Sequence, residues 1–115
     1  MKRILWLSQH RPLPRQVEEL KHLFGDVEVL QDINSFANAE EIVRRYKAGG
    51  YDDVVVVAPL SVIARLCELG LKPLWAEMKQ VRSWEEADLL YRGRFYRFVR
   101  FRRIKAVKLE FEELN

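Results

Sequence analysis

Two short apolar runs dominate the pattern of hydrophobic and polar positions along the chain. Residues 4 to 7 read Ile-Leu-Trp-Leu, and residues 54 to 57 are four consecutive valines. Both runs are too short for a helix and are bounded by polar or turn-forming residues, which is typical of strands buried on both faces of a sheet. We therefore expect two central strands, at about residues 3 to 7 and 54 to 58.

Three stretches between and after these runs have helical periodicity. The first begins at Pro14, which suits the first position of a helix, and stops at Gly25. The second follows Asn38, which forms a plausible capping box with Glu41, and continues to about residue 47. The third extends to about residue 69 and is apolar nearly all round. A short apolar stretch at residues 27 to 30 predicts a strand nearer an edge of the sheet.

The last third of the chain changes character. Alternation over residues 73 to 81 predicts a fourth strand, with Pro73 at an edge or strand-opening position. Residues 87 to 92 and 94 to 101 flank Gly93 as the two arms of a hairpin. Val107, Leu109 and Phe111 alternate with charged residues and predict one more strand with a wet face. We expect an antiparallel C-terminal extension on a parallel βαβαβ core.

Right-handed crossovers between parallel strands restrict the topology of this core. They give a strand order that begins 2-1-3, in a Rossmann-like α/β domain with helices on both faces of the sheet. Ligands bind such folds where the strand order reverses, here between the first and third strands. Two loops with helix N-termini would line this crevice, and an anion is the natural ligand. Their residues are Ser8, Gln9, His10 and Arg11 in one loop and Pro59, Leu60 and Ser61 in the other.

Composition narrows the class of protein. The 115 residues suffice for one domain, residues 1 to 115, and no apolar run approaches the length of a membrane span. Cys67 is the only cysteine, so no internal disulfide can form and a cytoplasmic location is expected. We expect its thiol to be an inert core group. The sequence has no metal-ligand spacing, so we predict neither a metal site nor a cofactor.

The charge is concentrated near the C-terminus. Between Arg92 and Lys108 there are eight basic residues and no acidic one, interleaved with four aromatic residues. Such a stripe, with Arg94 and Arg97 near its start, can hold phosphates and stack bases. The other interpretation is a solvated strand face whose arginines pair with acidic residues nearby.

Two segments carry a resemblance to a known family. The string Leu-Ser-Gln-His at residues 7 to 10, followed by Pro12, Pro14, Gln16 and Leu20, resembles the opening of small CRISPR-associated and mobile-element proteins. The stretch VVVVAPLSVIARLCELG is similar to their second signature. These proteins resemble single-domain CARF-type (CRISPR-associated Rossmann-fold) sensors, several of which are ring nucleases. The resemblance implies a homodimer that binds and cleaves cyclic oligoadenylate, with Ser8 and His10 at the matched positions. Gln9 stands where the family usually has Arg, and Leu13 where Thr is common.

The sequence leaves two alternative functions open, and they differ in the role of the loop after the first strand. In the first, the ligand's own 2′-hydroxyl attacks without a metal, Arg11 and the helix N-termini stabilise the developing charge, and His10 moves a proton. In the second, the protein is a non-catalytic nucleotide- or RNA-binding accessory module that uses the basic stripe, and His10 only caps a helix or bonds within its loop. His22 lies between Lys21 and Leu23 in the first helical segment and is expected on the surface.

Overall fold

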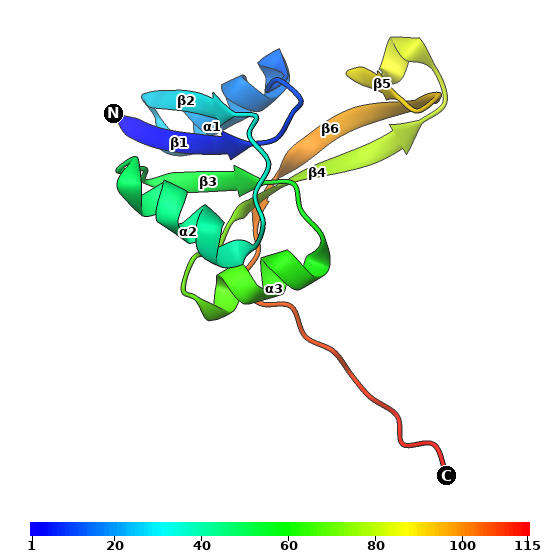
Figure 1. The fold of residues 1–115 in the computed structure, drawn as a ribbon. Coiled ribbons are helices and arrows are strands. Elements are labelled where there is room, and N and C mark those ends of the chain that lie inside the picture. The colour runs from blue at the N-terminus through cyan, green and yellow to red at the C-terminus, as the bar shows by residue number, and fades with distance from the viewer.

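The computed structural model describes residues 1–115 as a sheet with helices on both faces (Figure 1). The sheet has six strands in the order β2-β1-β3-β4-β6-β5. Strands β1 to β4 run parallel, whereas β6 is antiparallel to both β4 and β5. The elements are β1 (Lys2–Leu7), α1 (Pro14–Phe24), β2 (Val27–Asp32), α2 (Ala39–Ala48), β3 (Asp53–Val56), α3 (Leu60–Glu68), β4 (Leu74–Val81), a short 3-10 helix (Trp84–Glu86), β5 (Leu89–Tyr91) and β6 (Arg94–Arg103).

The parallel half of the sheet agrees with the sequence-based expectation. Strands β1 and β3 are internal, β2 lies at an edge, and the order begins 2-1-3. Side chains alternate across β1, so Ile4 and Trp6 pack on the α1 side, whereas Leu5 and Leu7 pack against α2 and α3. Each face thus has its own apolar core, which explains why the two strands read as uninterrupted apolar runs.

The β4 strand lies between β3 and β6, not at an edge of the sheet. Its parallel pairing with β3 is limited to Val55 opposite Leu74, but β6 pairs along the whole of its length. Pro73 is buried just before the strand, where a missing N–H costs no ladder hydrogen bond. The β4–β6 ribbon extends beyond the helices and carries β5 at its far end (Figure 1).

The predicted hairpin around Gly93 is confirmed. Its turn residues Arg92 and Gly93 have φ angles of 51° and 75°, the left-handed values that a two-residue type I′ turn requires. The first arm begins at Leu89, because the 3-10 helix occupies the chain just before it. Arg92 is the one residue other than glycine with a positive φ, so this turn holds a side chain in an unfavourable backbone conformation.

The predicted strand around residues 107 to 111 is wrong. Residues 104 to 115 have no regular secondary structure. Ile104 and Val107 still pack against the core beside α2 and α3, and the chain leads away from the rest of the molecule after them (Figure 1). Leu109 and Phe111 are 77% and 88% exposed. Alternation predicts which side of a strand is apolar, but a strand also needs a neighbouring backbone for hydrogen bonding, and the chain leaves the sheet after Arg103. The antiparallel extension therefore consists of β5 and β6 alone.

The amino end of the parallel strands is closed by charged side chains. Asp53, only 4% exposed, accepts hydrogen bonds from both terminal nitrogens of Arg103 at 2.6 and 2.8 Å, and Lys2 lies 3.7 Å away. The hydrogen bond from Arg103 to Asp53 raises the pKa of the guanidinium. Asp52 and Asp53 lie at the end of the sheet opposite the loops after β1 and β3. None of the helices is both long enough and apolar enough to cross a membrane.

Candidate functional site

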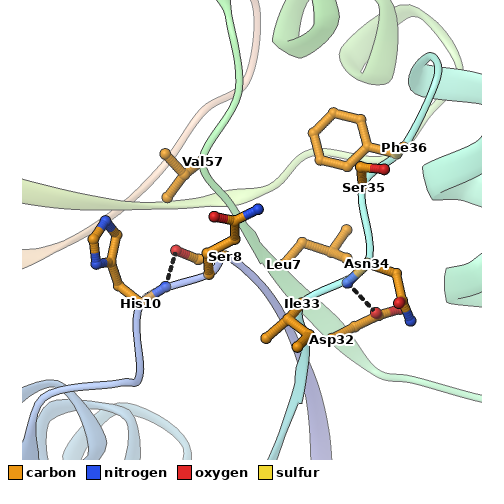
Figure 2. Close-up of a pocket in the computed structure, with 10 residues that line it drawn as sticks. Leu7, Ser8, His10, Asp32, Ile33, Asn34, Ser35, Phe36 and Val57 are labelled. Atoms are coloured by element: carbon orange, nitrogen blue, oxygen red, sulfur yellow. Dashed lines mark hydrogen bonds between the residues drawn. The ribbon is translucent and has the colours of Figure 1, made fainter.

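A hollow of about 320 Å³ lies at the carboxyl end of β1 and β2 (Figure 2). One wall is the loop after β1, and the other is the loop after β2; Val57, which follows β3, also lines the hollow on the side of the first wall. The ten lining residues are Leu7, Ser8, Gln9, His10, Asp32, Ile33, Asn34, Ser35, Phe36 and Val57. We call it the β1–β2 hollow.

The first wall is held by the core beneath it. The indole N–H of Trp6, a buried residue of β1, donates to the carbonyl of His10 at 2.9 Å. The hydroxyl of Ser8 accepts from the backbone N–H of His10 at 3.1 Å (Figure 2). These two bonds fix the backbone of His10, while its imidazole makes no hydrogen bond within the chain and is exposed. Both nitrogens of the ring therefore remain open to a hydrogen-bond partner.

The second wall is held by a side chain from α2. Arg45 donates to the carbonyl of Asn34 at 3.0 Å and to the carbonyl of Ser35. The carboxylate of Asp32 accepts from the N–H of Asn34 at 2.9 Å (Figure 2). Gln31 links the two walls, because its amide donates to the carbonyl of Ser8 at 3.0 Å. The spacing of the hollow is thus set before any ligand enters.

The start of α2 supports this wall. Asn38 caps the helix by accepting from the N–H of Glu41 at 2.9 Å, as predicted. The carboxylate of Glu41 turns back to the N–H of Ala37, one residue earlier than a standard capping box requires. That bond, together with the guanidinium of Arg45, holds the pKa of Glu41 below its ordinary value.

The hairpin is in direct contact with the first wall. The ring of Tyr91 meets the imidazole of His10 edge to face, with centroids 5.4 Å apart. The guanidinium of Arg92 lies 5.2 Å from the centroid of the same tyrosine ring, and Arg94 is the cross-strand partner of Tyr91. Residues about eighty positions apart in the chain therefore meet at the rim of the hollow.

Asp88 holds the hairpin in this position. Its carboxylate accepts from Arg15 of α1 at 2.6 Å and from the backbone N–H of Phe98 at 2.8 Å. The first contact reaches the body of the molecule and the second stays within the ribbon. Asp88 thereby sets the distance between Tyr91 and the loop that carries His10.

The predicted crevice between β1 and β3 is displaced by one strand. Ser8, Gln9 and His10 line the hollow as expected, but Arg11 does not. Pro59 and Ser61 are exposed and line neither hollow, whereas Leu60 lines a second, wholly apolar one of about 420 Å³ beside Trp75. Val57 contributes to both hollows and separates them, which is why the two predicted loops do not share a crevice.

The N-terminus of α1 offers less to an anion than the sequence suggested. Pro14 has no N–H, and the N–H of Leu13 already donates to the side chain of Gln16 at 2.8 Å. The N–H groups of Gln16 and Val17 bond to the carbonyl of Leu13. Most donors of the first turn are therefore already paired.

The basic stripe is divided between two faces of the ribbon. The register places Arg94 on the α1 side with Tyr91, whereas Arg97 is paired with Lys79 on the opposite side. Three arginines of the stripe are paired with acidic groups: Arg100 and Arg102 each lie 3.1 Å from Glu77, and Arg103 bonds to Asp53. The solvated-face interpretation holds for these three.

The structure contains no group of three or more His, Cys, Asp or Glu side chains that could hold a metal ion. Cys67 is half-buried on α3, with its sulfur 3.6 Å from the carbonyl of Ile104, and it packs against the core on that side. His22 is exposed on α1, as predicted.

Sequence reasoning missed the second wall and Tyr91. The second wall could have been predicted, because a strand order beginning 2-1-3 places the loop after β2 beside the loop after β1. No local signal marks Tyr91, whose position depends on how the ribbon leans over α1. No protein family, curated protein or solved structure matches the chain.

Proposed function

We propose that this protein binds an RNA-type phosphodiester ligand, a cyclic oligoadenylate, in the β1–β2 hollow and cleaves it without a metal ion. The observation that carries the proposal is the contact between His10 and Tyr91. It brings an imidazole to the rim of a polar hollow, next to the basic turn of the hairpin. Phosphodiester chemistry needs a proton carrier and cations close together.

Binding would use both walls of the hollow. Amide and hydroxyl groups of Gln9, Asn34 and Ser35 can pair with the edges of a base, and the ring of Phe36 offers a stacking surface. The volume lies near the lower end of the range for small-molecule sites, so we expect one nucleotide of the ring to enter. We also propose that β2-β1-β3 and their helices form a Rossmann-like nucleotide-binding unit, which the position of the hollow supports.

Cleavage would follow an internal transfer. The 2′-oxygen of the ligand attacks the adjacent phosphorus, its proton passes to His10, and the bond from phosphorus to the 5′-oxygen breaks. The products are a cyclic 2′,3′-phosphate and a 5′-hydroxyl, whose proton His10 returns. Arg92 lies beside Tyr91 at the rim of the hollow, and Arg11 directly follows His10 in the chain. Neither forms an ion pair within the chain, so both are available to stabilise the charge on the phosphate oxygens. Ser8 holds the backbone of His10, and its hydroxyl hydrogen remains free to donate to phosphate.

One observation favours binding without cleavage as the second candidate. No carboxylate orients the imidazole of His10, because Asp32, the acidic residue of the hollow, is engaged with Asn34 and Arg45. A histidine held through its backbone and one ring contact can also serve as a ligand contact alone. In that case the protein is a nucleotide-binding module.

The deciding experiment uses labelled cyclic tetra-adenylate and hexa-adenylate in the presence of EDTA. We expect linear products from wild type, and His10→Ala should lower the single-turnover rate by about 100-fold while the dissociation constant stays within a few-fold. His22→Ala, on the exposed side of α1, is the matched control and should leave both unchanged. Binding without products would establish the second candidate, and no binding of either ring would contradict both.

We further propose that two copies act together in the cytoplasm. A cyclic oligoadenylate has rotational symmetry and each chain offers one modest hollow, so a two-fold dimer would enclose the ring with the same loops from both copies. The apolar side of α3 and the C-terminal segment are the candidate contact surfaces. Sedimentation at micromolar concentration tests this, and a monomer under those conditions would rule out a shared site. The single cysteine, which forms no disulfide, supports the proposed compartment.

A further inference from the structure

We infer that residues 108 to 115 of one copy dock on the uncovered side of the β4–β6 ribbon of a second copy. This inference rests on the proposed dimer and states which surfaces form it. We call the docking surface the outer ribbon face. Its members project away from α1 and are Trp75, Glu77, Lys79, Phe95, Arg97, Arg100 and Arg102.

The register of the ribbon defines this face. Trp75 is opposite Arg102, Glu77 opposite Arg100, and Lys79 opposite Arg97, so their side chains share one side of the sheet. The alternate residues, such as Met78 and Phe98, belong to the core under α1. The helices α2 and α3 cover β3 but do not reach the outer part of the ribbon (Figure 1).

The outer ribbon face combines exposed aromatic rings with positive charge. Trp75 is 43% exposed, and Trp84, which is 61% exposed, lies against Phe95 with centroids 5.9 Å apart. The face has four cationic residues and one carboxylate, Glu77, which both Arg100 and Arg102 share. Lys79 and Arg97 have no acidic partner, so the face retains a net positive charge. The aromatic rings lie at the two ends of the face, with Trp75 at one end and Phe95 and Trp84 at the other. Exposed aromatic and arginine side chains are enriched at protein interfaces.

The C-terminal segment has the complementary chemistry. Its apolar residues Leu109, Phe111 and Leu114 are 77%, 88% and 88% exposed. The acidic residues Glu110, Glu112 and Glu113 lie between and beside them in the sequence. No residue after Val107 joins either core cluster or makes a hydrogen bond within the chain. The apolar residues can pack among the aromatic rings, and the long side chains of the face can reach carboxylates beside an extended segment.

The partner is a second copy because the segment is directed away from its own ribbon (Figure 1). Ala106 and Val107 still line the apolar hollow beside Trp75, so a return to the same ribbon needs a sharp turn after Val107. Residues 107 to 111 contain no Gly, Pro, Asn, Asp or Ser that would favour such a turn. Extended, the eight residues 108 to 115 span about 26 Å, which matches the eight residues of β4. A two-fold axis lets each copy offer its segment and receive the other.

The test is a charge exchange in the full chain, followed by sedimentation equilibrium over a micromolar series. Lys79→Glu with Arg97→Glu should weaken dimerisation at least about tenfold, and Glu110→Lys with Glu112→Lys should do the same. Combining all four should restore the wild-type constant to within about threefold, because opposite charges face each other again. The control pair, Arg44→Glu with Lys47→Glu on the exposed side of α2, should change nothing.

Truncation before Lys108 gives a second, independent readout. The shortened chain should be monomeric and melt at the temperature of the wild-type monomer, because the removed residues touch nothing in their own copy. A dimer that survives truncation, or a charge exchange that restores nothing, would overturn the docking while leaving the proposed dimer intact. A wild-type chain that is monomeric throughout would overturn both, and cyclic oligoadenylate binding to that monomer would still test the hollow. If the Lys79 and Arg97 variant instead loses only affinity for single-stranded RNA, the face binds nucleic acid and the inference is wrong.

Discussion

The two ends of the parallel strands are built in opposite ways. At the amino end, Asp53 and Arg103 form a largely buried ion pair, and Asp52 accepts from the backbone N–H of Arg3 at 2.8 Å. At the carboxyl end, the side chains of Ser8 and Asp32 accept from the backbone of their own loops. The other polar side chains of the β1–β2 hollow make no hydrogen bond within the chain. At the amino end of the sheet, therefore, the charged groups are paired with other groups of the protein. At the carboxyl end, polar groups remain available to a ligand.

This difference predicts that substitutions at the two ends will have different effects. A buried carboxylate must be paired, so removing a partner at the amino end leaves an uncompensated charge. The exposed groups at the carboxyl end can be removed with little cost to folding, because water replaces the lost bonds. Variants at the amino end should change stability without changing the site, and variants at the carboxyl end should do the reverse.

The largest expected effect comes from breaking the amino end. Arg103→Ala leaves Asp53 with only the more distant Lys2 and should lower the free energy of unfolding by about 3 kcal/mol, the low end for a broken buried pair because Arg103 is partly exposed. Urea denaturation of the variant and of Arg44→Ala, an exposed control, measures the difference. Equal stability in the two variants would show that the pair contributes nothing.

A smaller stability effect is expected from Arg45→Ala, at the carboxyl end. Its bonds to the carbonyls of Asn34 and Ser35 are surface bonds, so the cost to unfolding should be about 1 kcal/mol. Affinity for cyclic tetra-adenylate should nevertheless fall about tenfold, because the second wall loses its support. Isothermal titration gives the affinity. A loss of stability without a loss of affinity would contradict the role assigned to this wall.

A substitution in the hairpin turn should raise the stability of the protein, whereas the two preceding substitutions should lower it. Arg92→Asn should raise the free energy of unfolding by about 0.5 kcal/mol, because asparagine tolerates a positive φ better than arginine does. Arg92→Ala removes the same charge without that gain and serves as the matched control. Both should weaken ligand binding by a similar factor, measured by titration. If only the alanine variant binds weakly, the effect is one of backbone geometry and not of charge.

The smallest effect is the response to acid. The pKa of Glu41 is lowered in the folded state, so its contribution to stability is present above its ordinary value near 4.5 and is lost as the pH falls through the folded-state pKa. Wild type should therefore lose slightly more stability below about pH 4.5 than Glu41→Gln. Thermal melts of both chains across the acid range check the sign. Parallel curves would mean that the bonds of Glu41 to Ala37 and Arg45 do not couple to folding.

The amino-acid pattern alone determined the parallel half of this protein. The signals were local: two uninterrupted apolar runs and the residue types at the helix ends. The Gly93 turn of the hairpin is local in the same way. Such signals depend only on neighbours in the chain, so they can be recognised without knowledge of the tertiary structure. The placement of Ser8, Gln9 and His10 at the carboxyl end of the sheet, in the β1–β2 hollow, follows from the same local rules. These residues lie directly after a central strand, and ligands bind beyond the carboxyl ends of parallel strands.

Only the tertiary structure decided the rest. The second wall, the contact between His10 and Tyr91, the separation of Arg94 from Arg97 and the pairing of Arg103 with Asp53 all join residues from distant parts of the chain. The strand predicted around residue 109 failed for the same reason, since its alternation describes a face but not a hydrogen-bonding neighbour. Contacts between distant segments depend on how the ribbon and the helices pack on the sheet, and no local pattern encodes that packing.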